Sequence, residues 1–87
     1  MKAEVTGRKA NDSYRGGKFT WFFFKCLDAD NFGKSYRTCT APEFRNWNSW
    51  SGVKVGMVLD NLQVRSGTLL DADSDFRVVK NDTNISM

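Results

Sequence analysis

Short runs of β-branched and aromatic residues alternate with clusters of turn-forming residues along most of the chain. The breaks are rich in glycine, asparagine, aspartate and serine, and they fall at Gly16-Gly17, Asp30-Asn31-Phe32-Gly33, Ser51-Gly52, Gly56 and Ser66-Gly67. This pattern is typical of strands in a small all-β domain. It predicts strands at 2–10, 18–27, 34–40, 57–64 and 75–80.

Several breaks predict particular turns. Residues 28–33 are expected to close a hairpin between the second and third strands, and Ser66-Gly67 turns the chain near the end of the fourth. Leu69-Leu70 is expected to pair briefly before residues 71–74 turn the chain again.

The one helix signal lies between the third and fourth predicted strands. Thr40 and Glu43 have the spacing of a capping box, which marks a helix N-terminus. Phe44 and Trp47 follow three residues apart and give the short helix an aromatic face. Ser51-Gly52 is expected to end it, and Phe44 and Trp47 are expected to plug one end of a barrel.

Three strands, a short helix and two further strands are the order of elements in the OB-fold. We therefore predict an all-β fold, a small five-stranded OB-fold-like barrel with one short helix between strands 3 and 4. An SH3-like barrel has a similar pattern and stays open as an alternative. A chain of 87 residues makes one domain, which we place at 1–80, followed by a polar tail at 81–87 that we expect to be mobile.

The segment 18–27 is unusual because both of its faces are aromatic. Strand alternation puts Phe19, Trp21 and Phe23 on one face and Phe22 and Phe24 on the other. A barrel needs one apolar face for its core. The other aromatic set must meet a partner chain, a ligand or a covering loop.

Basic residues are concentrated around this strand. Residues 1–54 contain ten basic and five acidic residues, whereas residues 55–87 contain three and five, so the overall net charge of +3 conceals a more basic first half. Bases stack on aromatic rings while Lys and Arg contact phosphates, so interleaved groups of both kinds make a platform for a single strand. The candidate contacts of this platform are Arg15, Lys18, Trp21, Lys25, Lys34, Tyr36 and Arg37. Trp50, in a polar loop beyond the helix, is a further candidate that could equally belong to the core.

The composition excludes several other kinds of chemistry. The chain has no histidine, which removes the commonest general base and metal ligand. The run Asp71-Ala-Asp73-Ser-Asp75 resembles the start of a calcium loop, but Phe76 stands where that loop requires glycine, so a turn held by Asx hydrogen bonds is favoured. We expect no metal, no cofactor and no enzymatic activity, because the sequence contains no catalytic motif.

The apolar segments also bear on location. The N-terminus lacks the apolar core of a signal peptide, and the longest apolar run is too short to span a bilayer. We therefore expect a cytoplasmic protein, without a membrane partner, whose Cys26 and Cys39 are free thiols.

Several motifs resemble those of the small single-stranded DNA-binding proteins of filamentous phages. Ser13-Tyr-Arg-Gly-Gly-Lys-Phe19 is similar to that family's basic, glycine-containing approach to the second strand, and Lys25-Cys26-Leu27-Asp28 to its buried cysteine and acidic turn. Gly33-Lys34-Ser35-Tyr36 is similar in placement, and Val64–Asp71 with Phe76–Lys80 resembles the closing hairpin and last basic strand. The likeness covers about residues 2–80.

The resemblance implies an OB-fold homodimer that coats single-stranded DNA during phage replication, in the cytoplasm of a bacterial host. Carried over to this chain, it implies DNA contacts from Arg15, Lys18 and Phe19, from the region of Lys34 and Tyr36, and from Arg77. One departure is that the closing hairpin, residues 65–68, lacks the aromatic residue that the phage proteins present there.

The predicted function is therefore sequence-tolerant binding of single-stranded DNA in phage or plasmid DNA replication. The residue pattern does not distinguish DNA from RNA. The alternative is a small phage- or plasmid-encoded inhibitor or adaptor that binds a host protein through its aromatic face. Lys and Arg beside the aromatics favour a phosphate-bearing partner, since the cores of protein-binding surfaces are depleted of Lys.

Overall fold

A curved, mostly antiparallel sheet makes up the greater part of the protein in the computed structural model, which describes residues 1–11, 19–42 and 44–80. Within these ranges there are seven strands, one α-helix and one short 3₁₀ turn. Their bounds are β1 (Ala3–Asn11), β2 (Phe19–Cys26), η2 (Ala29–Asn31), β3 (Ser35–Thr40), α1 (Trp47–Ser51), β4 (Val58–Asp60), β5 (Val64–Ser66), β6 (Leu69–Leu70) and β7 (Arg77–Lys80). The all-β prediction is confirmed.

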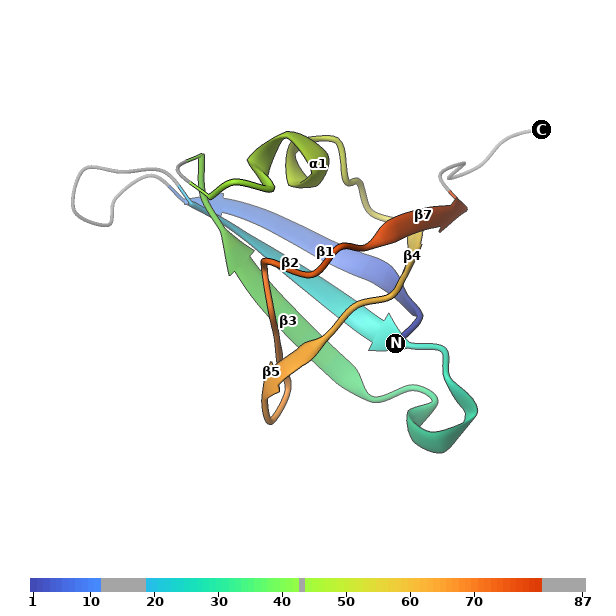
Figure 1. Cartoon of the computed structure of the whole chain (residues 1–87). Coiled ribbons are helices and arrows are strands. Elements are labelled where there is room, and N and C mark those ends of the chain that lie inside the picture. The colour runs from blue at the N-terminus through green and yellow to red at the C-terminus, as the bar shows by residue number, and fades with distance from the viewer. Residues whose placement is uncertain (12–18, 43, 81–87) are drawn as a thin grey trace.

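The strand order in the sheet is β5-β6-β3-β2-β1-β4-β7. All neighbours are antiparallel except β3 and β6, which pair in parallel. Figure 1 shows β1, β2 and β3 running side by side as the longest strands, behind the segment that carries β4, β5 and β7, while α1 lies over one end. The sheet therefore has an inner face toward that segment and an outer face on its far side.

The predicted number of five strands is wrong, because the fourth predicted strand is divided into β4 and β5 and the brief pairing expected at Leu69-Leu70 is a strand of its own, β6. Asn61 has a φ of 66°, a left-handed conformation that asparagine tolerates better than most residues. Its side-chain amide donates to the backbone carbonyl of Asp75 at 2.9 Å. The ladder stops at this residue, so β4 pairs with β1 and β7 while β5 pairs with β6.

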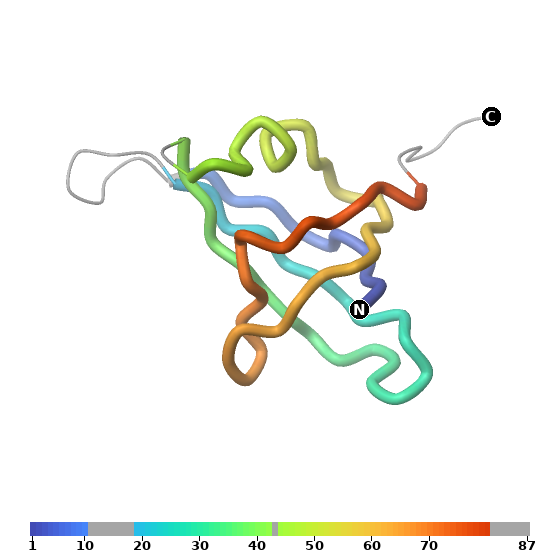
Figure 2. Tube along the Cα trace, viewed as in Figure 1, coloured from blue at the N-terminus to red at the C-terminus, as the bar shows by residue number. Residues whose placement is uncertain are grey.

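This division also leaves the barrel incomplete. The segment 58–66 crosses from β4, inside one half of the sheet, to β5 at the opposite edge, and its course can be followed in Figure 2. Among the described residues β5 and β7 are the two edge strands, and they do not pair with each other. The sheet is thus curled into a half-barrel.

The helix begins later than the sequence predicts. Thr40 is still part of β3, where it pairs with Thr20, and its buried hydroxyl has no hydrogen-bond partner, so it does not cap a helix. Phe44 and Trp47 lie in successive turns, in which the N–H of Phe44 donates to the carbonyl of Ala41 and that of Trp47 to the carbonyl of Phe44. The N-cap of α1 is Asn46, and the expected capping partner Glu43 lies outside the described residues.

The core lies between the inner face of the sheet and the segment in front of it. Trp50 is its largest side chain and is fully buried. Its ring lies 4.4 Å from that of Phe76 and 5.2 Å from that of Phe22, measured between centroids. Trp47 packs against this core, as predicted, whereas Phe44 remains 38% exposed.

The predicted turns are confirmed where the structure describes them. The turn between β2 and β3 contains η2 and ends at Gly33, whose φ is 87°. Gly67, with a φ of 56°, turns β5 into β6. The N–H of Asp73 donates to Oδ1 of Asp71 at 2.9 Å, which is the Asx hydrogen bond expected there in place of a calcium loop.

Candidate nucleic-acid interface

The two aromatic faces of β2 have different environments. Phe22, Phe24 and Cys26 point inward and are at most 1% exposed. Trp21 is half-buried and Phe23 is 39% exposed on the outer face. The expectation of a second aromatic set beyond the core is confirmed, and the outward set is the one that contains Trp21 and Phe23.

A bulge in β1 brings a lysine beside these rings. The pairing of β1 with β2 shifts between Val5 and Gly7, so that Thr6 has no partner in the ladder. Beyond it, Gly7 pairs with Phe23 and Lys9 pairs with Trp21. Lys9 therefore joins the outer face, a placement that the sequence pattern did not reveal.

Gly7 also allows Phe23 to lie close to β1. A Cβ atom added at Gly7 would stand 3.2 Å from Cδ2 and 3.5 Å from Cβ of Phe23. The first distance is tighter than an ordinary van der Waals contact, so any larger residue would force the ring to shift. The missing side chain of Gly7 thus sets the position of this exposed ring.

Arg37 reaches the same rings from β3. It pairs with Phe23 across the sheet, and its guanidinium carbon lies 5.8 Å from the centroid of the Trp21 ring, within the range of a cation–π contact. Its backbone N–H donates to the carbonyl of Thr68 at 3.0 Å. This bond connects Arg37 to the β5–β6 hairpin and holds its strand in place.

Lys9, Trp21, Phe23 and Arg37 together line a shallow hollow of about 370 Å³ on the outer face. We call these four residues the aromatic-basic patch. Two rings and two cations lie side by side there, and none of the four is acidic. A planar base can stack on such rings while its phosphates pair with the cations.

A second aromatic contact lies where β2 enters the turn. Nζ of Lys25 is 5.8 Å from the centroid of the Phe32 ring, and Phe32 is 68% exposed. Lys25 was predicted as a contact residue, whereas Phe32 was not. The sequence could have indicated that Phe32 is exposed, because it lies in a turn that ends at Gly33 and no strand face can bury a residue there.

Tyr36 is a correction to the predicted interface. It is 5% exposed and belongs to the core, where it pairs with Phe24. Tyr36 and Arg37 are consecutive in a strand, so their side chains must point to opposite faces. Lys34 lies beside Tyr36 and not in the patch, since its Nζ is 5.3 Å from the centroid of the tyrosine ring.

Trp50 is a second correction. Its indole N–H donates to the backbone carbonyl of Ala72 at 2.8 Å, and the side chain is fully buried. It cannot stack on a base unless the core opens. The loop composition around it indicated exposure, but the helical turn directs this side chain inward.

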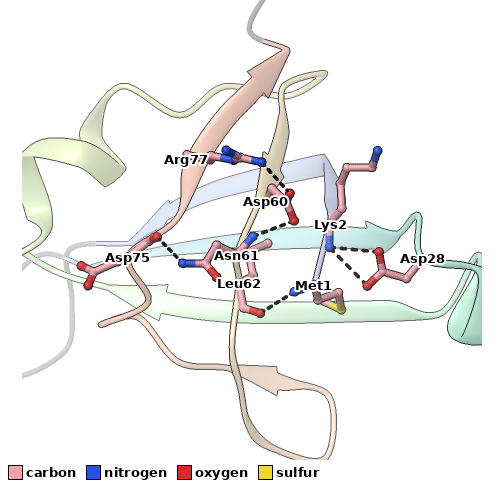
Figure 3. A network of polar contacts seen from close by, with 8 residues as sticks. All are labelled: Met1, Lys2, Asp28, Asp60, Asn61, Leu62, Asp75 and Arg77. Atoms are coloured by element: carbon pink, nitrogen blue, oxygen red, sulfur yellow. Dashed lines mark hydrogen bonds and ion pairs between the residues drawn. The ribbon is translucent and has the colours of Figure 1, made fainter.

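Arg77 lies apart from the patch, on β7, with β4 and β1 between it and β2. Figure 3 shows its guanidinium facing Asp60, at 3.4 Å. Hydrogen bonding from the backbone N–H of Asn61, together with Arg77, lowers the pKa of Asp60, although desolvation opposes the shift. A paired arginine beside acidic residues is less available to a phosphate than the cations of the patch.

Two predicted contacts, Arg15 and Lys18, lie outside the described residues. Phe19 is the first residue of β2 and is half-buried. Strand alternation puts it on the same outer face as Trp21. The structure therefore brings Trp21 and Arg37 together, and it places Phe19 at the start of β2 on the same face.

Cys26 and Cys39 are free, on the inner and outer faces, and burial raises the pKa of Cys39. Across the described ranges, no group of three or more His, Cys, Asp or Glu residues is placed to hold a metal ion. No helix in the same ranges has the length and apolar character needed to cross a membrane.

The aromatic-basic patch and the Lys25–Phe32 contact are thus the two places on the described surface where cations lie over exposed or half-exposed rings of β2 and its turn. Both use side chains from the outer face of the first hairpins. No family model, curated protein or solved structure matches this chain.

Proposed function

We propose that the protein binds single-stranded DNA with little sequence preference, through the aromatic-basic patch. The observation that supports this proposal is the hollow formed by two rings and two cations on an open sheet face. Every base has a face that can stack, so stacking tolerates any sequence, and Lys and Arg contact the backbone that all sequences share. A role in phage or plasmid DNA replication, in the cytoplasm of a bacterial host, rests on the motif resemblance.

The proposal predicts that oligothymidylate quenches the fluorescence of Trp21 and that added salt reverses the quenching. Salt weakens binding because each phosphate that is neutralised releases counterions, with a slope of about 0.7 in log K per contact for a single strand. Titrations in 20 mM and 200 mM salt would measure this slope. Oligouridylate in parallel would distinguish DNA from RNA.

Single substitutions identify the site. Trp21→Ala should weaken oligothymidylate binding about 5- to 150-fold, since stacking on one aromatic is worth about 1–3 kcal/mol. Arg37→Ala should weaken binding and lower the salt slope by about 0.7. Arg45→Ala is the matched control, because it removes the same charge from an exposed residue that lies outside the patch.

A folded protein that shows no quenching at low salt would contradict the proposal. It would favour the alternative function, in which the same aromatic face docks onto a host protein. That alternative predicts no salt-dependent oligonucleotide binding. It also predicts that Trp21→Ala abolishes association with a protein partner.

A further inference from the structure

Phe32 is the most exposed large hydrophobic residue in the described part of the chain, at 68%. Its turn is held by backbone hydrogen bonds on both sides. The N–H of Gly33 donates to the carbonyl of Cys26 at 2.9 Å, and that of Lys34 donates to the carbonyl of Asn31 at 2.9 Å. The ring is therefore presented to solvent by a fixed backbone, which lowers the entropy that a ligand would have to overcome.

The ring is also continuous with the outer face of β2. Lys25, whose ammonium lies 5.8 Å from the ring centroid of Phe32, is on the same face as Trp21 and Phe23. Four residues of strand separate Trp21 from Lys25, which corresponds to about 13 Å. At the spacing of about 3.4 Å per nucleotide of a fully stacked strand, about four nucleotides would cover this distance, and a more extended strand would need fewer.

We propose that Phe32, with Lys25 beside it, is a second base-stacking platform, and that a single strand runs along the outer face of β2 from the aromatic-basic patch to the turn. This inference rests on the proposed function. It adds the path of the bound strand over the sheet, and it adds Phe32, a residue outside the predicted contacts. The ligand it specifies is a single strand long enough to reach both platforms.

The charges around Phe32 nearly balance. Lys25 faces Glu4 across the β1–β2 pair, and Asp28 and Asp30 belong to the turn itself. Lys2 and Lys34 lie close to the same end of the sheet. Three basic and three acidic residues thus surround Phe32, and because its own side chain is uncharged, it contributes stacking and no counterion release.

Loss of an uncharged ring has a different signature from loss of a cation, because only the cation changes the salt slope. Phe32→Ala should weaken the binding of a twelve-nucleotide oligothymidylate by at least fivefold without changing the salt slope. For a two-nucleotide oligomer, whose two bases are both taken up by the Trp21 and Phe23 rings of the patch, the loss should be less than twofold. Anisotropy of end-labelled oligonucleotides at two salt concentrations would measure both effects.

Two further variants separate stacking from simple apolar contact. Phe32→Trp keeps a ring that can stack and should retain the affinity of the natural protein for the longer oligomer. Phe32→Leu keeps an apolar side chain without a ring and should behave like Phe32→Ala. Circular dichroism would verify that each variant is folded, which is expected because Phe32 is largely outside the core.

Other outcomes would overturn the inference. If the natural protein binds the oligomers and Phe32→Ala binds the longer one equally well, the second platform is wrong and the proposed function stands. If Phe32→Ala alters only self-association, measured by sedimentation, the ring is a contact between protein chains. If the natural protein binds neither oligomer, the proposed function and the second platform both fail.

Discussion

Trp21 and Trp50 show how the position of a single residue decides its role. Trp21 stands on the outer face of β2, under the guanidinium of Arg37. Trp50 is fully buried, and its indole N–H satisfies the carbonyl of Ala72. The two tryptophans should therefore respond to substitution in opposite ways, one through binding and the other through stability.

Trp50→Phe should destabilise the fold by about 1–3 kcal/mol, because it leaves the buried carbonyl of Ala72 without a donor. Urea unfolding followed by circular dichroism would measure this loss. The fraction that remains folded should bind oligothymidylate with unchanged affinity. A folded Trp50→Phe protein that had lost binding would return this residue to the interface.

At the level of the elements, strand alternation explains what could be predicted from the sequence. The two aromatic faces of β2, the turn after it and the brief pairing of β6 follow from residues close together in the chain. Alternation was available for β3 as well and already separated Tyr36 from Arg37. The inward direction of Trp50 was not available, because it depends on how α1 packs on the sheet.

The bulge at Thr6 could not be predicted from the local sequence either, because it depends on contacts with distant residues. Val5 exchanges backbone hydrogen bonds with the segment before β4, since its N–H donates to Met57 and its carbonyl accepts from Gly56, both at 2.8 Å. This contact bends β1 where its register with β2 shifts. Without it, Lys9 could not be placed beside Trp21 from the local sequence.

Gly7→Val tests whether this element positions the patch. A β-branched residue suits a strand better than glycine does, so the free energy of unfolding should change by no more than about 1 kcal/mol. The new side chain must, however, displace the ring of Phe23, because Cδ2 of that ring would lie only 3.2 Å from a Cβ atom at position 7. Oligothymidylate affinity should fall several-fold.

Ala10→Val is the matched control for that variant, since Ala10 is an exposed residue of the same strand. It should leave affinity unchanged. Equal affinity of Gly7→Val and the natural protein would mean that the position of Phe23 does not matter for binding. The patch would then depend on Trp21 and its cations alone.

At the scale of the whole molecule, Met1 and Arg77 both contact the segment 60–62, away from the patch. The N-terminal ammonium donates to the carbonyl of Leu62 at 2.9 Å, and Arg77 of the last strand faces Asp60 (Figure 3). The break between β4 and β5 lies at the centre of this network. Polar contacts here stabilise the half-barrel, while the opposite face of β1–β3 carries the rings and cations.

We expect the stability of the fold to depend on pH through Asp60. Because Asp60 lies away from the patch, oligothymidylate binding should not depend on this residue. The pKa of Asp60 is lowered in the folded protein, so its contribution to stability is complete above the ordinary aspartate pKa of 3.8 and is lost as pH falls through the lower folded value. Asp60→Asn removes the charge that Arg77 and the N–H of Asn61 stabilise. It should lower Tm at pH 7.

The difference in Tm between Asp60→Asn and the natural protein should shrink as the pH falls from 4 to 2, because the natural carboxylate becomes protonated over that range. Thermal unfolding followed by circular dichroism at several pH values would measure it. A difference that stayed constant down to pH 2 would mean that the side chain acts through packing rather than charge. Oligothymidylate affinity at pH 7 should be the same for both proteins, since Asp60 lies two strands away from β2.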